Sequence, residues 1–198
     1  MRGRGSTAGV WQRRVIPALL GVVLVAGCTE GGPEPASSTT APVADVTPTP
    51  TATPVVKPER PAAMDEPTTD GAIAAATYFL QLYDYAFSAG DAGPLMAMSG
   101  ETCTYCSYVD EQVQSMVTGG YSSVRTPAAV VQSDSTEIRE DEWFRVSLRA
   151  EQGPLVTVGP DGTREQTSDG GVADFVFAIS WIGDDWRVEG VDIVVPQS

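Results

Sequence analysis

The sequence contains no histidine, three cysteines, and only 12 lysines and arginines against 26 aspartates and glutamates among its 198 residues. Without histidine, the chain has no Ser-His-Asp triad, no Cys-His dyad and no histidine-ligated zinc site. The formal net charge of −14 opposes binding to polyphosphate, so we expect no nucleic-acid partner. The length fits one domain with an added segment and excludes a large multidomain enzyme.

The apolar run near the N-terminus, residues 15–25, has only 11 residues. Four arginines precede it, and the first acidic residue is Glu30. At ~1.5 Å per residue a helix of this length is too short for a hydrocarbon core of ~30 Å. The run therefore predicts a signal peptide over residues 1–27 and not a membrane-spanning helix. The Arg13-Arg14 pair leaves twin-arginine export as an alternative to general secretion.

The run ends in Val25-Ala26-Gly27-Cys28, which resembles the bacterial lipobox. The resemblance implies that Cys28 receives a diacylglyceryl group and N-acylation and becomes the N-terminus after cleavage. Two or more acyl chains are enough for lasting membrane attachment. We therefore expect a lipoprotein on the outer face of the plasma membrane, where removal of the signal changes the net charge from −14 to −18. A plain secretory signal with a chance cysteine is the alternative.

Residues 28–64 have the composition of a tether. Positions 29–64 hold eight prolines, seven threonines and six alanines, with no leucine, isoleucine or aromatic residue. Such a segment cannot bury enough apolar surface to offset its ordering entropy, so we expect disorder. All tyrosines and phenylalanines lie after residue 64, which predicts one folded domain over residues 65–198.

Within residues 65–198, the apolar period changes from helical to alternating after Gly120. Asp70 suits the cap that begins a first helix, and Gly90 ends it. The predicted class is α+β: three N-terminal helices packed on one face of a curved antiparallel sheet of about five strands. The predicted helices are residues 71–89, 94–98 and 104–118, and the predicted strands are 128–138, 143–150, 155–159, 163–167, 172–182 and 186–195.

Three short motifs together resemble a family. They are Ala89-Gly90-Asp91 leading into Pro94-Leu95, Cys103-Thr104-Tyr105-Cys106, and the hairpin Trp181-Ile182-Gly183-Asp184-Asp185-Trp186-Arg187-Val188. The domain resembles uncharacterised actinobacterial lipoproteins with a nuclear-transport-factor-like fold, also described as SnoaL-like or a cystatin-like roll. The resemblance implies a cone-shaped roll that often holds a pocket. It implies no activity, because this fold carries isomerases, dehydratases, cyclases and binding proteins.

Cys103 and Cys106 remain as a pair once Cys28 is lipidated. Their spacing places them one turn apart, and the predicted compartment is oxidising, so we expect a local disulfide. So short a loop contributes only about 2 kcal/mol by the chain-entropy estimate. A thiol-disulfide redox pair is the alternative, although no basic residue is near in the sequence and Glu101 opposes a lowered thiolate pKa. Two cysteines without histidine cannot supply a zinc site.

Six residues are candidates for lining a pocket in the cone. An aspartate with a raised pKa beside tyrosine hydroxyls can do acid-base work on a small apolar ligand. The alternative, which we favour, places Asp84 on the solvent face and turns Asp174 and Asp192 outward; strict alternation puts Asp192 in phase with Trp186 and Val188. The pocket candidates are Tyr78, Tyr83, Asp84, Phe175, Phe177 and Trp181.

Trp143, Arg145 and Arg149 share one face of a predicted strand. If exposed, this aromatic-arginine patch is suited to anchor a protein partner. The alternative is a face covered by the helices. Trp181 or Trp186 is the expected neighbour of the patch. The 22 acidic residues after residue 64 lack the calcium-loop pattern Asp-x-Asp-x-Asp-Gly, so we expect an acidic surface, no metal and no cofactor.

These observations predict a membrane-anchored lipoprotein of the cell envelope whose domain binds without catalysis. The expected ligand is a small apolar molecule in the cone or a protein of the envelope. A SnoaL-like enzyme of isomerase or dehydratase type, using Asp and Tyr in the pocket, is one alternative. A thiol-disulfide protein using Cys103 and Cys106 is another.

Overall fold

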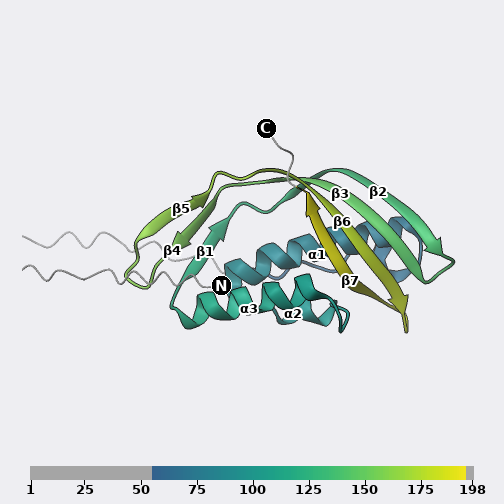
Figure 1. The fold of residues 1–198 in the computed structure, drawn as a ribbon, viewed down its shortest axis with the longest axis horizontal. Helices are drawn as coiled ribbons and strands as arrows, with labels where there is room; N and C mark the ends of the chain where they lie inside the picture. The colour runs from purple at the N-terminus through teal and green to yellow at the C-terminus, as the bar shows by residue number, and fades with distance from the viewer. Residues whose placement is uncertain (1–54, 195–198) are drawn as a thin grey trace, which may run out of the picture. The chain divides into compact units, whose positions relative to one another are not determined.

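The computed structural model describes residues 55–194 (Figure 1). The predicted signal peptide, Cys28 and the tether up to residue 54 lie outside these residues. Within residues 55–194, no helix is both long enough and apolar enough to cross a membrane. The elements are η1 (Ala62–Asp65), α1 (Thr69–Ala89), α2 (Gly93–Ala97), α3 (Thr104–Thr118), β1 (Ser122–Arg125), β2 (Ala129–Arg139), β3 (Trp143–Gln152), β4 (Leu155–Val158), β5 (Arg164–Ser168), β6 (Gly171–Ile182) and β7 (Asp185–Val194).

The class α+β is confirmed, but the single sheet of about five strands is wrong. The strands form a four-stranded antiparallel sheet in the order β2-β3-β6-β7 and a three-stranded sheet in the order β1-β4-β5. The β3-β6 ribbon is interrupted where Gly153 and Gly170 pack closely, since a Cβ on Gly170 would lie 2.2 Å from the Gln152 carbonyl oxygen. Beyond this point the chain continues as β4 and β5 and pairs with β1, a short strand without apolar alternation that the sequence did not reveal.

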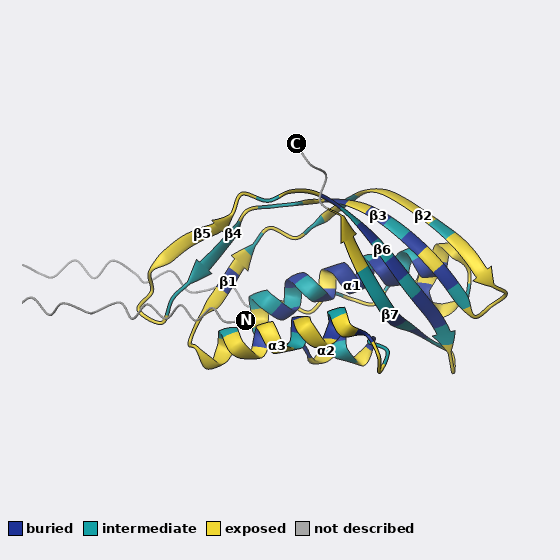
Figure 2. Cartoon of the chain, in the orientation of Figure 1, coloured by how far each residue is buried: buried dark blue, intermediate teal, exposed yellow. Residues whose placement is uncertain are grey.

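The helices lie on one side of the four-stranded sheet (Figure 1). Buried residues alternate with less buried ones along β3 and β6, as Figure 2 shows, so one face of each strand supplies the core. Helix α1 packs against this face, with the Phe79 ring 6.0 Å from the Phe177 ring in an edge-to-face arrangement. Gly90 ends α1 with φ of 71°, as predicted, but the cap at its start is Thr68 and not Asp70: the Thr68 hydroxyl accepts a hydrogen bond from the Gly71 amide.

A β-bulge in β7 changes which residues share a face. The β6-β7 register shifts between Ala178, which pairs with Gly190, and Ile179, which pairs with Val188. The extra residue places Trp186 and Val188 on the same inner face as Val191, although their numbers differ in parity. Asp192 therefore faces outward opposite Val176, as expected, but it does not share a face with Trp186 and Val188 as strict alternation predicts.

The folded part begins before the predicted boundary at residue 65. Met64 is only 1% exposed, and its carbonyl oxygen accepts a 3.0 Å hydrogen bond from the Trp186 indole nitrogen. Upstream, the Pro58 carbonyl accepts a hydrogen bond from the Tyr78 hydroxyl. Residues 55–64 thus pack on the domain, although their composition resembles that of the tether. One methionine side chain and two carbonyl groups make the contacts, and the composition does not indicate them.

Gly71 allows the N-terminal segment to approach α1, and its substitution tests this packing. A Cβ at this position would lie 2.2 Å from the Glu66 carbonyl oxygen and 3.0 Å from both the Ala63 carbonyl oxygen and the Trp186 indole. We expect Gly71→Ala to lower the free energy of unfolding by about 3 kcal/mol, measured by urea denaturation. Gly190→Ala is the control, because an added Cβ there meets nothing within 4 Å. Equal urea midpoints for the two variants would contradict this account.

Candidate functional site

The concave side of the four-stranded sheet is filled by aromatic side chains. Phe79, Phe144, Phe177 and Trp186 are each at most 1% exposed, and the Phe144 ring lies 5.1 Å from that of Trp186. Such close-packed interiors leave little space for a ligand. The structure therefore does not gather the predicted pocket residues around one interior cavity.

The six pocket candidates are divided among separate places. Phe175 and Phe177 belong to the core, and the Trp181 ring packs 5.0 Å from that of Trp186 near the β6-β7 turn. Tyr78 contacts the N-terminal segment through its hydroxyl. Tyr83 and Asp84 lie together at a separate place, near the C-terminal end of α1.

Asp84 is buried, so the expectation that it lies on the solvent face is wrong. Its side chain is 7% exposed, and one carboxylate oxygen, Oδ2, accepts a 2.7 Å hydrogen bond from the Ala128 amide. The other oxygen, Oδ1, lies 3.6 Å from Nη1 of Arg125, whose side chain is 11% exposed. Strand β1 brings Arg125 to this place, and because the sequence did not reveal this strand, it did not reveal the cation either.

Aromatic rings enclose the Asp84–Arg125 pair on one side. The Arg125 guanidinium carbon lies 5.3 Å from the centre of the Tyr83 ring, and Tyr83 stacks on Tyr105 with ring centres 6.5 Å apart. Burial raises the pKa of Asp84, an effect that the Ala128 amide and Arg125 oppose. Burial also raises the pKa of Tyr83 and of Tyr105. These phenols are therefore weak proton donors at neutral pH, which argues against acid catalysis here.

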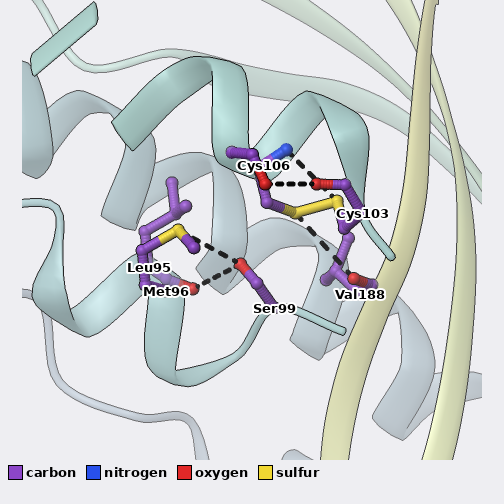
Figure 3. The surroundings of a disulfide bond; sticks show 7 residues. Leu95, Met96, Ser99, Cys103, Cys106 and Val188 are labelled. Atoms are coloured by element: carbon purple, nitrogen blue, oxygen red, sulfur yellow. Dashed lines mark hydrogen bonds between the residues drawn. A yellow bond between two sulfur atoms is a disulfide. The ribbon is translucent and has the colours of Figure 1, made fainter. Parts of the chain in front are cut away.

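The sulfur atoms of Cys103 and Cys106 are bonded, 2.04 Å apart (Figure 3). Cys103 caps the start of α3, and both cysteines are at most 1% exposed. The sulfur of Cys106 lies 3.9 Å from the Val188 carbonyl oxygen, which accepts a hydrogen bond from the Gly100 amide. The Gly100–Val188 hydrogen bond therefore holds the loop before α3 against β7, and the disulfide lies beside it. Because a thiolate must reach a sulfur atom to exchange with it, this burial argues against a redox role.

The outer face of the four-stranded sheet carries Trp143, Arg145 and Arg149. These residues alternate with the buried face of β3, so they point away from the helices, and the alternative of a helix-covered patch is wrong. Trp181 and Trp186 are on the opposite, inner face, so neither is a neighbour of the patch. A hollow of about 360 Å³ lies here, lined in part by Ile138, Trp143, Arg145, Val176, Ala178 and Asp192.

Over residues 55–194, no group of three or more histidine, cysteine, aspartate or glutamate side chains is arranged to hold a metal ion. Two groups of polar and aromatic side chains remain as candidate sites. They are the Asp84–Arg125 pair with its tyrosines, and the outer-face patch of Trp143, Arg145 and Arg149. The first is buried and the second is open to partners.

The buried Asp84 carboxyl makes a pH-dependent contribution to stability. Because its pKa is raised in the folded state, the folded chain holds this proton more tightly than the unfolded chain does. The stability that the folded chain gains from holding this proton is fully present below the unfolded pKa of about 3.9. It is lost as the pH rises through the raised pKa of the folded state. As the pH rises from 3 to 7, we therefore expect the free energy of unfolding of Asp84→Asn to increase relative to that of the native chain, measured by urea denaturation. Asp134→Asn, on an exposed residue, is the control, and an equal trend in both variants would contradict the assignment.

Among solved structures, the intermembrane-space region of the chloroplast protein ARC6 is similar with a TM-score of 0.51 and 10% identity, covering 65% of this chain and 98% of that one. This likeness concerns the fold. An NTF2-like protein of unknown function from Pseudomonas putida KT2440 has a TM-score of 0.40 at 12% identity, with 65% and 89% of the two chains covered. A cystatin-like domain of unknown function from Nostoc punctiforme PCC 73102 has a TM-score of 0.41 at 14% identity, with 66% and 81% covered.

NTF2-like and cystatin-like proteins are thus among the solved structures that the α+β fold is similar to. No curated protein matches the chain significantly in sequence. The model of a family of unknown function, DUF6318, matches residues 45–192 and so covers more than half of the chain. The protein therefore belongs to the DUF6318 family.

Proposed function

We propose that this chain is a lipoprotein anchored through Cys28 on the outer face of the plasma membrane, and that its domain binds a protein partner without catalysing a reaction. The lipobox-like Val25-Ala26-Gly27-Cys28 and the short apolar run before it support the anchor. The filled interior and the raised pKa values of the partly buried Tyr83 and Tyr105 support a binding role over an enzymatic one.

The single observation that carries the binding proposal is the hollow at Trp143 and Arg145 on the uncovered face of the sheet. Tryptophan and arginine are the residues that most often contribute large shares of binding energy at interfaces. Arg149 forms an ion pair with Asp174 at 3.7 Å, whereas Arg145 has no carboxylate partner among residues 55–194. Arg145 is thus available to a carboxylate of the partner, while Val176 and Ala178 supply apolar contact beside the Trp143 ring.

The anchor is tested by metabolic labelling with palmitate and by cell fractionation. We expect the native chain to carry the label and to sediment with membranes, and Cys28→Ala to lose both properties. A double variant, Cys103→Ser with Cys106→Ser, is the matched control and should keep the label, because it removes the other two cysteines. Label that persists in Cys28→Ala would exclude the anchor.

The binding face is tested by photo-crosslinking in intact cells. A benzophenone amino acid replaces Ile138, which is 65% exposed and lines the hollow, or Val124, which is 50% exposed on the three-stranded sheet. We expect one discrete protein adduct from position 138 and none of the same size from position 124. Arg145→Glu should reduce that adduct at least tenfold, because it places a carboxylate where the partner's carboxylate binds.

Arg164→Glu, on an exposed residue of β5, is the matched charge reversal and should leave the adduct unchanged. An adduct that both charge reversals reduce equally would show a dependence on net charge and not on this face. The absence of a discrete adduct at position 138 would remove the support for a partner here.

A further inference from the structure

The floor of the outer-face hollow is made of small residues. Ala178 of β6 pairs with Arg145 on one side and with Gly190 on the other, so the three residues form a row across the sheet. A Cβ added at Gly190 would meet nothing within 4 Å, so the space above this residue is open. Val176, the next outward residue of β6, extends the floor. The hollow therefore exists because small side chains occupy the centre of this face, and its floor is apolar.

Two charges of opposite sign lie on opposite sides of this floor. Arg145 and Asp192 are the charged residues among those that line the hollow, and both are exposed. Asp192 pairs with Val176, one outward position beyond the row of Ala178. From the usual spacing of strands and the rise per residue, the Cα atoms of Arg145 and Asp192 are roughly 12 Å apart. Neither residue forms an ion pair within residues 55–194, so the hollow offers one uncompensated charge on each side.

We infer that the partner contacts this hollow with an extended segment of the pattern acid-x-apolar-x-base, in which x is any residue. Alternate residues of an extended chain lie on the same side, and the first and fifth are about 13 Å apart. This spacing matches that between Arg145 and Asp192. The acid pairs with Arg145, the base pairs with Asp192, and the apolar side chain between them fills the space above Gly190. The inference rests on the proposed partner face and names the chemistry that this face selects.

The test is an NMR titration of the full chain, labelled with nitrogen-15 and solubilised in detergent micelles. The probe is the peptide acetyl-Glu-Thr-Val-Thr-Lys-amide, and the readouts are the signals of the Trp143 indole N–H and the Gly190 amide. We expect both signals to shift saturably. The matched probe, acetyl-Glu-Thr-Val-Thr-Gln-amide, should bind about threefold more weakly, because it carries no cation to pair with Asp192.

Asp192→Asn tests the pairing with the base. We expect this variant to bind the two probes equally, because the preference for lysine comes from the Asp192 carboxylate. Asp134→Asn is the matched control, since it removes the same charge from an exposed residue that does not line the hollow, and it should keep the preference. Equal loss of the preference in both variants would show general charge attraction and would overturn the inference.

Gly190→Leu tests the space above the floor. The leucine side chain would occupy the room that the valine of the probe needs, so we expect the saturable shift of the Trp143 signal to disappear. Ala129→Leu adds bulk at an exposed position of β2 that does not line the hollow, and as the control it should leave the shift intact. If Gly190→Leu fails to fold, the comparison of Asp192→Asn with Asp134→Asn decides the result.

The inference is overturned if the lysine probe gives no saturable shift with the native chain, if the two probes bind equally to it, or if the shift persists in Gly190→Leu. This failure differs from that of the partner face. A discrete adduct at Ile138 that depends on Arg145, together with equal binding of the two probes, would retain the face and remove the charge pattern. Without an adduct at Ile138, the proposed function fails and the inference fails with it.

Discussion

The packing of the Trp186 indole is the interaction on which the rest of the domain depends. Its ring is fully buried against Phe144 and Trp181, and its nitrogen donates to the Met64 carbonyl oxygen. One side chain thereby joins β7, β3, β6 and the segment before α1. Because a buried indole needs both apolar neighbours and a partner for its N–H, this place cannot be loosened without loss in several elements at once. It also completes the filling of the concave side, so little space is left there for a ligand.

The helices and most strands were predictable because their signals are local. Alternation along residues 143–150 and 172–182 identified β3 and β6, and Gly90 marked the end of α1. The failures are all non-local. Strand β1 has no apolar period and exists because β4 pairs with it. Asp84 is surrounded by apolar residues in the sequence, yet its burial is compensated by Arg125, 41 positions later. The bulge that separates Asp192 from the face of Trp186 and Val188 arises from the register between β6 and β7 and leaves no mark in the composition.

In the candidate site, too, the local features were predictable from the sequence and the non-local ones were not. Trp143, Arg145 and Arg149 share a strand face that the sequence identifies, so the patch itself was predictable, but its exposure required knowledge of where the helices pack. The disulfide between Cys103 and Cys106 was predictable from spacing, whereas its burial against Val188 was not. The boundary at residue 65 was misplaced because a composition rich in proline and alanine resembles a tether even where Met64 is enclosed.

Arg125 and Arg145 differ in how their charges are compensated. After residue 64 the chain has six arginines and 22 acidic residues, so acidic side chains greatly outnumber the arginines that can pair with them. Arg125 is nearly buried, and one carboxylate compensates its charge, so its role is to hold Asp84 in the folded domain. Arg145 is exposed, and no carboxylate pairs with it in the described part of the chain, so what it offers is charge. The buried arginine is therefore suited to an internal ion pair, and the exposed one to a protein surface whose carboxylate approaches through solvent.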